Sequence, residues 1–243
     1  MTRTFLLLAA SALALTACDR GVHKWSRHKW GEHPQMTAVS KLDCPEEQGD
    51  LKRTSAEPDG KSCVYAADGT EVTLKVVALN GGDAEAALKP VEAELKTLIP
   101  QSANSAVKDA GTTDDVNINL PGVSINANDN GAKVNVGPVH IDADDSKANG
   151  TVSVNSDHHG EKTVVNANGG DAEIRTQSDR GGTRLTYILT SDKASPGAYK
   201  LVGYEARGSL SGPLVVAVVK AKDKKDRDVF DDMKALLKHN VGG

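Results

Sequence analysis

Hydrophobic residues are spaced differently in successive parts of the chain, and each spacing predicts a different kind of element. A run over Phe5–Leu15 that is apolar except at Ser11 comes first, and a polar stretch without periodicity follows it over residues 19–40. Alternating apolar and polar residues over 41–79, with turn signals at Gly60 and Asp68-Gly69, then predict short β-hairpins.

A helical spacing replaces the alternation over residues 84–99. Apolar residues recur there on one stripe, and Asp83 stands before them as a candidate N-cap. Pro90 lies inside the segment and is expected to kink or divide the helix, because proline lacks the amide hydrogen and its ring crowds the preceding turn. Pro100 is expected to end it.

Residues 101–182 form a zone of different composition, rich in Asn, Asp, Gly, Ser and Val and without aromatic residues. Short apolar segments begin at Val116, Val134 and Val152, at successive intervals of 18. In composition and period the zone resembles the valine- and glycine-rich repeats of bacterial putative-adhesin families. We expect stacked hairpins or a short β-solenoid, and the alternative is a low-complexity segment that does not fold.

The last part of the chain, 183–243, returns to globular patterning. Strands are predicted over 184–190, 199–204 and 214–219, and the third is apolar on both faces, which is typical of a central strand. An amphipathic helix is expected over 228–239. The fold class is therefore α+β, a small mixed or antiparallel sheet with two helices, carrying the 101–182 zone as a β-rich insertion between 41–100 and 183–243.

The N-terminal apolar run reads as an export signal. Arg3 precedes it, and the run is shorter than the roughly 20 residues that a membrane-spanning helix needs. It ends in Leu15-Thr16-Ala17-Cys18, which resembles the lipobox of bacterial lipoproteins. The resemblance implies cleavage after residue 17 and acylation of Cys18, which anchors the protein through several acyl chains. An ordinary signal peptide is the alternative.

The anchor predicts a cell-envelope location, facing the periplasm or the cell surface. Asp19, directly after Cys18, matches the residue that favours retention in the inner membrane in some bacteria. The expected partners are membrane lipid, through acylated Cys18, and another envelope component, either a protein or a polysaccharide.

The other two cysteines, Cys44 and Cys63, are left for one another once Cys18 is assigned to lipid. A disulfide between them is expected because export places them in an oxidising compartment. Two free thiols or a metal-binding pair are the alternatives.

The polar stretch over 18–40 is predicted to be a flexible tether. Its Lys and Trp residues suit a membrane interface. His23, His28 and His33 recur every five residues, so a metal-binding tether is an alternative, although this spacing does not align ligands on one helix face.

Charge and composition exclude some partners. The formal net charge is −4 and aromatic residues make up 3% of the chain. Nucleic-acid binding needs basic patches and stacking platforms, so it is not expected.

Catalytic signatures for hydrolases, metalloproteases and nucleotide-binding proteins do not occur in the sequence. The metal-ligand candidates are His158-His159 and, for a hard cation, Asp142 and Asp144; polar turns are the alternative for both groups, and no cofactor is expected.

Arg207 and Gly208 precede a Ser/Gly/Pro-rich segment and are expected to form an exposed corner that contacts a partner.

These features together predict a non-enzymatic, membrane-anchored lipoprotein with a binding, adhesion-type or scaffold role. An accessory factor for secretion or assembly of envelope proteins is the first alternative. An uncharacterised hydrolase or transferase that uses His158 and His159 is the second.

Overall fold

A computed structural model describes most of the chain from Pro34 onward. The described residues are 34–79, 83–99, 116–120, 123–128, 131–136, 139–143, 151–158, 160–168, 171–191, 193, 195–223 and 227–242. The predicted signal and most of the predicted tether therefore lie outside the described part.

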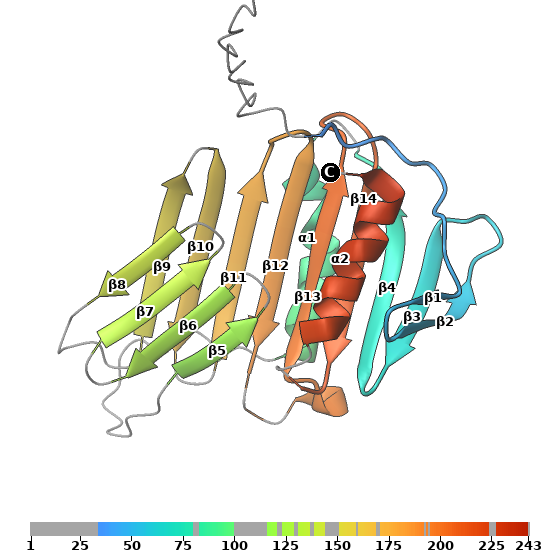
Figure 1. Cartoon of the computed structure of the whole chain (residues 1–243). Helices are drawn as coiled ribbons and strands as arrows, with labels where there is room; N and C mark the ends of the chain where they lie inside the picture. Colours follow the sequence, from blue (N-terminus) through green and yellow to red (C-terminus); the bar gives the residue numbers. More distant parts are fainter. Residues whose placement is uncertain are drawn as a thin grey trace, which may run out of the picture. The chain divides into compact units, whose positions relative to one another are not determined.

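One antiparallel sheet of ten strands organises the folded body, in the order β1-β2-β3-β4-β14-β13-β12-β11-β10-β9 (Figure 1). The α+β class is confirmed, and the sheet is larger than the small one expected. Its strands are β1 (Glu47–Gln48), β2 (Leu51–Ala56), β3 (Ser62–Ala67), β4 (Thr70–Val77), β9 (Thr151–His158), β10 (Glu161–Asn168), β11 (Asp171–Ser178), β12 (Thr183–Thr190), β13 (Leu201–Gly208) and β14 (Leu214–Ala221).

Strand β14 lies in the middle of this sheet, as its continuous apolar run predicted. It pairs with β13 on one side and with β4 on the other. Residues 214–219 are buried on both faces. The pairing of Val76 with Val215 joins the N-terminal hairpins to the C-terminal strands across a long stretch of sequence.

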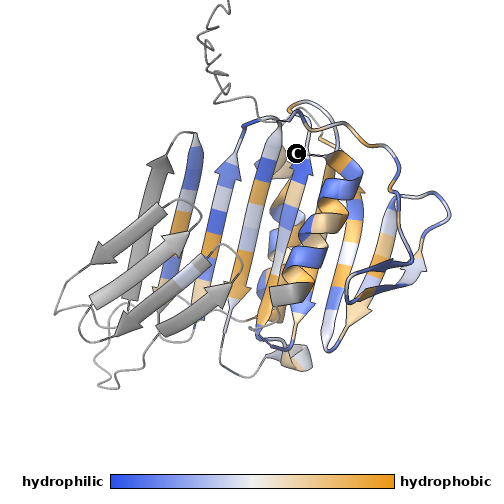
Figure 2. Cartoon of the chain, in the orientation of Figure 1, coloured by the Kyte–Doolittle hydropathy of each residue, from blue (hydrophilic) through white to orange (hydrophobic). Residues whose placement is uncertain are grey.

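Two helices cover opposite faces of the sheet, α1 (Ala84–Leu98) and α2 (Arg227–Val241) (Figure 1). Leu88, Val91 and Leu95 of α1 pack into one core with β12, β13 and β14. Phe230 and Leu237 of α2 belong to a second core on the other face. Figure 2 shows hydrophobic residues along β13 and β14, whereas β10 and β11 are mostly hydrophilic.

Helix α1 begins as the sequence predicted, because the Asp83 Oδ1 accepts a hydrogen bond from the Ala86 amide at 3.1 Å. The helix continues through Pro90 to Leu98, so the expected division of the helix is wrong. Pro90 and Ala86, whose carbonyl the proline leaves without its helical donor, are both exposed. Water can satisfy that carbonyl, which reduces the penalty of an internal proline.

A separate four-stranded antiparallel sheet is formed by β5 (Val116–Leu120), β6 (Val123–Asn128), β7 (Gly131–Val136) and β8 (Val139–Ala143). Each strand pairs with its neighbour in sequence, as in stacked hairpins, whereas the coils of a β-solenoid pair in parallel. Ile125 is the register partner of both Ile118 and Val134. Equivalent positions, such as Ile118 and Val134, are therefore 16 residues apart, two fewer than the predicted interval of 18. Because side chains alternate between the two faces of a strand with a period of two, a shift of two residues keeps each residue on the same face.

Candidate functional site

Charged residues interrupt the apolar pattern on the sheet face that also carries α2. Alternate residues of β12 and β13 point to that face, and near one end of these strands they are Arg184, Glu205 and Arg207. Arg184 and Arg207 are direct cross-strand partners. The register thus places two guanidinium groups side by side on one face.

Arg207 is buried and has a partner on its own strand. Its Nε donates to the Glu205 Oε1 at 2.6 Å, and its Nη2 lies 2.6 Å from the same oxygen. Arg207 is 7% exposed and Glu205 is 5% exposed. A buried charge needs such a partner, because desolvation strongly disfavours an unpaired one.

Arg184 differs from its neighbour. Its side chain is partly exposed and forms no hydrogen bond or ion pair with the residues that the structure describes. The Nε atom of this side chain is buried and has no hydrogen-bond acceptor among them. Burial lowers the pKa of Arg184, and the positive charge of Arg207 lowers it further, while Glu205 and Glu161 act in the opposite direction. Burial is the largest of these effects, so the pKa of Arg184 lies below that of a solvated arginine.

Hydroxyl side chains continue the polar row toward the outer strands. Ser178 of β11 is the register partner of Arg184, and Thr176 is the partner of Thr186. Thr163 of β10 is buried, and its Oγ1 has no hydrogen-bond partner. Together with the two arginines, these groups form a surface that we call the arginine row: Glu161, Thr163, Thr176, Ser178, Arg184, Thr186, Glu205 and Arg207.

The opposite face carries a second charged cluster, in which the arginine has carboxylate partners. Arg175 of β11 donates from Nη1 and Nη2 to the two carboxylate oxygens of Glu92 on α1, at 2.9 and 2.8 Å. It also donates to the Glu173 Oε1, and its guanidinium lies 4.3 Å from the ring centroid of Tyr187. The Tyr204 hydroxyl donates to the Glu92 Oε1 at 2.8 Å. This bidentate arrangement clamps α1 to the sheet.

Both tyrosines of this cluster hold their protons unusually tightly. Burial raises the pKa of Tyr204, and the Glu92 carboxylate raises it further. Burial also raises the pKa of Tyr187, and Glu173 adds to the effect. A phenolate in this cluster would lie in a low-dielectric region beside carboxylates, which disfavours the charged form.

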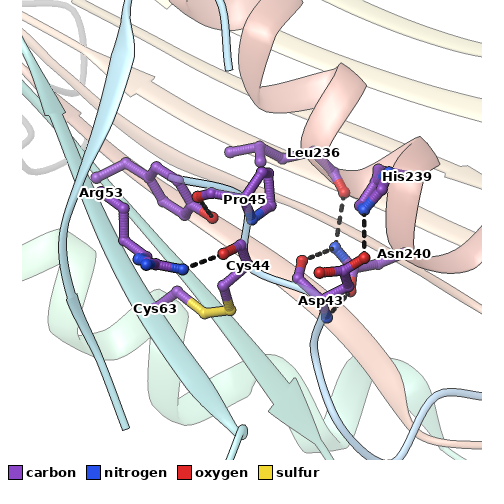
Figure 3. Close-up of polar contacts among 9 residues, drawn as sticks. Asp43, Cys44, Pro45, Arg53, Cys63, Leu236, His239 and Asn240 are labelled. Carbon is purple, nitrogen blue, oxygen red and sulfur yellow. Dashed lines mark hydrogen bonds and ion pairs between the residues drawn. A yellow bond between two sulfur atoms is a disulfide. The ribbon is translucent and has the colours of Figure 1, made fainter. Parts of the chain in front are cut away.

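The segment before β1 is tied to the end of α2 (Figure 3). The Asp43 amide donates to the Asn240 Oδ1 at 2.9 Å, and the Asn240 Nδ2 donates back to the Asp43 carbonyl at 3.1 Å. The His239 Nε2 lies 2.8 Å from the Asp43 Oδ2. Tyr65 donates from its hydroxyl to the Pro45 carbonyl, so both sides of the segment are fixed.

Cys44 and Cys63 meet beside this contact, as predicted. Figure 3 shows the bond between their sulfur atoms, and their Cα atoms are 6.4 Å apart, within the range of disulfides. Cys63 is buried in β3, and the Cys44 carbonyl accepts a hydrogen bond from the Arg53 guanidinium. The N-terminal segment is thus joined to the sheet covalently and by hydrogen bonds.

The other predicted site residues are placed only in part. Cys18, Asp144 and His159 lie outside the described residues. His158 ends β9, where its register partner is Glu161, and Asp142 lies in β8. Their roles stay predictions.

The exposure expected for Arg207 and Gly208 is wrong. They are the last two residues of β13, and both are buried. Gly208 pairs with Leu214 and Thr183, and a Cβ there would lie 2.6 Å from the Pro213 carbonyl oxygen. The exposed part of the corner comes later, at Leu210, which is 59% exposed.

Sequence reasoning missed most of both charged clusters. A signal for the arginine row was present, because Arg184-x-Thr186 and Glu205-x-Arg207 put polar residues on the same side of two strands that are otherwise rich in apolar residues. No comparable signal joined Glu92 to Arg175, which only the packing of α1 brings together.

Two further findings bear on function. Within the part of the chain that the structure describes, no group of three or more His, Cys, Asp or Glu residues is arranged to hold a metal ion. No described helix is both long and apolar enough to cross a bilayer.

Comparison with known proteins gave no relative. No protein-family model, curated protein or solved structure matches the chain.

Proposed function

We propose that the chain is a lipid-anchored protein of the bacterial cell envelope, and that its sheet body serves in binding or as a scaffold. The observation that supports this most is the use of the three cysteines. Cys44 and Cys63 lie in the same body at bonding distance, which leaves Cys18 of the lipobox-like segment for acylation. A disulfide persists in an exported protein, whereas thiols in the cytosol are kept reduced.

The position of the disulfide also suits an anchored protein. Cys44 lies near the start of the described body, and the neighbouring Asp43 is held to α2 by Asn240. The chain before this segment is already held to the body, because the Met36 and Thr37 amides donate to the Gly181 and Val241 carbonyls. The disulfide and the Asn240 hydrogen bonds add further attachments to β3 and α2.

We further propose that part of the 101–182 zone is inserted into the α+β body. The direct pairing of β4 with β14 supports this, because the sheet closes across the whole intervening stretch. The four-stranded sheet β5–β8 would form the self-contained part of the insertion, while β9, β10 and β11 extend the ten-stranded sheet.

Metabolic labelling with radioactive palmitate tests the anchoring. We expect the chain expressed in a bacterium to take up label and to fractionate with membranes, and the Cys18→Ala variant to do neither. The matched control is the Cys44→Ala/Cys63→Ala double variant, which should keep the label and lose the mobility shift that reduction causes on a gel. Absence of label in the chain with Cys18 intact would contradict the proposal.

A further inference from the structure

The arginine row contains two arginines and two glutamates, and among the described residues only Arg207 is paired with one of these glutamates. Arg184 and Arg207 are direct cross-strand partners, and like charges in this position destabilise a sheet. Glu205 pairs with Arg207 through two contacts to its Oε1, and among the described residues it makes no such contact with Arg184. Glu161 of β10 lies near enough to act on Arg184 through its field but forms no ion pair with it.

Two buried polar groups of the arginine row, on Arg184 and Thr163, have no hydrogen-bond partner. The buried Arg184 Nε has no acceptor, although a buried N–H without a partner is strongly disfavoured. Thr163 contributes a buried hydroxyl without a partner, two strands away on the same face.

Access to the row comes through Arg184, which is partly exposed while Arg207 and Glu205 are buried. The row lies at the end of the sheet where the N-terminal segment crosses it, because the Met36 amide donates to the Gly181 carbonyl at 2.7 Å. Gly181 is in the turn that leads into β12.

We propose that Arg184 and Arg207 form a binding site for a phosphate oxyanion, with Arg184 as the accessible donor. A phosphate group accepts the paired donors of a guanidinium in a fork geometry, and it would give the orphaned Arg184 Nε an acceptor. The phosphate can come from a lipid headgroup or from a soluble phosphate ester. This proposal extends the binding role proposed above and rests on it, whereas the acylation of Cys18 is tested separately.

Inorganic phosphate is the probe, and the full chain purified from membranes and reconstituted in phosphatidylcholine nanodiscs is the sample. We expect calorimetric titration to show phosphate binding, and Arg184→Met to weaken the affinity about tenfold or more. The matched control is Arg180→Met, which removes an exposed arginine from the same turn and should change the affinity by less than about twofold. Circular dichroism establishes that each variant is folded.

Equal affinity of Arg184→Met and the unaltered chain would overturn the proposal, as would absence of binding at about 10 mM phosphate. If Arg184→Met does not fold, Arg184→Lys keeps the charge but loses the fork and should weaken binding to a similar extent. Nanodiscs that also contain phosphatidylglycerol separate the two sources. A lower apparent affinity for inorganic phosphate assigns the site to a lipid headgroup, and an unchanged affinity assigns it to a soluble phosphate.

Discussion

Arg175 and Arg184 lie on adjacent strands of the same sheet, on opposite faces, and they differ in the number of partners that their guanidinium groups contact. Arg175 has two carboxylates and an aromatic ring within contact distance. Arg184 has no partner among the described residues and a second arginine beside it. Arginine on a sheet face is stabilised when the layer packed on that face supplies carboxylates, and only one of the two layers does.

The two helices explain this difference. Helix α1 contributes Glu92, which reaches two strands at once through Arg175 and Tyr204. Helix α2 faces the sheet with apolar residues such as Phe230 and Leu237. Its Asp232 points to the β1–β2 turn instead, where it accepts from the Asp50 amide at 2.9 Å. On the α1 face Arg175 thus forms ion pairs that stabilise the fold, whereas on the α2 face Arg184 has no ion-pair partner among the described residues.

Replacement of Arg175 by methionine should have the largest effect on stability. The change leaves Glu92 and Glu173 close together without a cation, and Glu92 is 15% exposed in its side chain. Loss of one partner from a buried pair costs 3–5 kcal/mol, and the partial exposure of Arg175 reduces the expected loss to about 2–3 kcal/mol. Urea denaturation followed by circular dichroism measures it.

The control for this prediction is Arg180→Met, since Arg180 is exposed. Its expected change is within about 0.5 kcal/mol. An Arg175→Met variant as stable as Arg180→Met would show that the clamp between α1 and the sheet contributes nothing to the free energy of unfolding.

Alkaline pH should weaken the same clamp. The folded state raises the pKa of Tyr204 and Tyr187 above the value of about 10 in the unfolded chain. Below pH of about 10 both tyrosines are neutral in both states, and the stability they contribute is fully present. Above it the unfolded chain loses the protons first, so the free energy of unfolding falls by about 1.4 kcal/mol per pH unit for each tyrosine.

The Tyr204→Phe variant removes one of the two titrating hydroxyl groups and so measures the contribution of Tyr204 to the pH dependence. The variant should show a shallower decline of stability above pH of about 10 than the unaltered chain, because one group fewer titrates. Parallel curves of unfolding free energy against pH for the two proteins would show that Tyr204 does not titrate differently in the two states.

The contact between the N-terminal segment and α2 depends mainly on neutral hydrogen bonds, each of which should contribute less than the Arg175 contacts. Asn240→Ala removes the reciprocal bonds to the Asp43 backbone and the bond to the Leu236 carbonyl. Since water can reach the exposed partners, we expect a loss of about 1 kcal/mol. His239→Ala, which removes a contact to an exposed carboxylate, should cost about half as much or less. A larger loss for His239 than for Asn240 would reverse this assignment.

The parts of the fold that follow from local pattern were predictable. The hairpin turns at Gly60 and Gly69, the Asp83 cap and the central position of β14 depend on residues near one another in sequence or on a run of apolar residues. The Cys44–Cys63 pairing followed from the small number of cysteines. These features require no knowledge of which elements pack together.

The contacts within the two charged clusters could not be predicted from the sequence for a physical reason. Glu92 and Arg175 come together only because α1 packs on β12 and β13, next to the strand β11 that carries Arg175. Arg207 looked exposed because it precedes a Ser/Gly/Pro-rich segment, yet β13 continues through it and through Gly208. Alternation in a strand shows which residues share a face, but not which layer covers that face.

Arg184→Met should have the smallest effect on stability and the opposite sign from Arg175→Met. The change removes a guanidinium that repels Arg207 and leaves no carboxylate without its contact partner, because Glu205 stays paired with Arg207. Methionine keeps an unbranched apolar stem over the sheet. We therefore expect the free energy of unfolding, measured by urea denaturation in phosphate-free buffer, to stay within about 0.5 kcal/mol or to rise slightly. A loss as large as that of Arg175→Met would mean that Arg184 holds the sheet together, and the contrast between the two faces would then disappear.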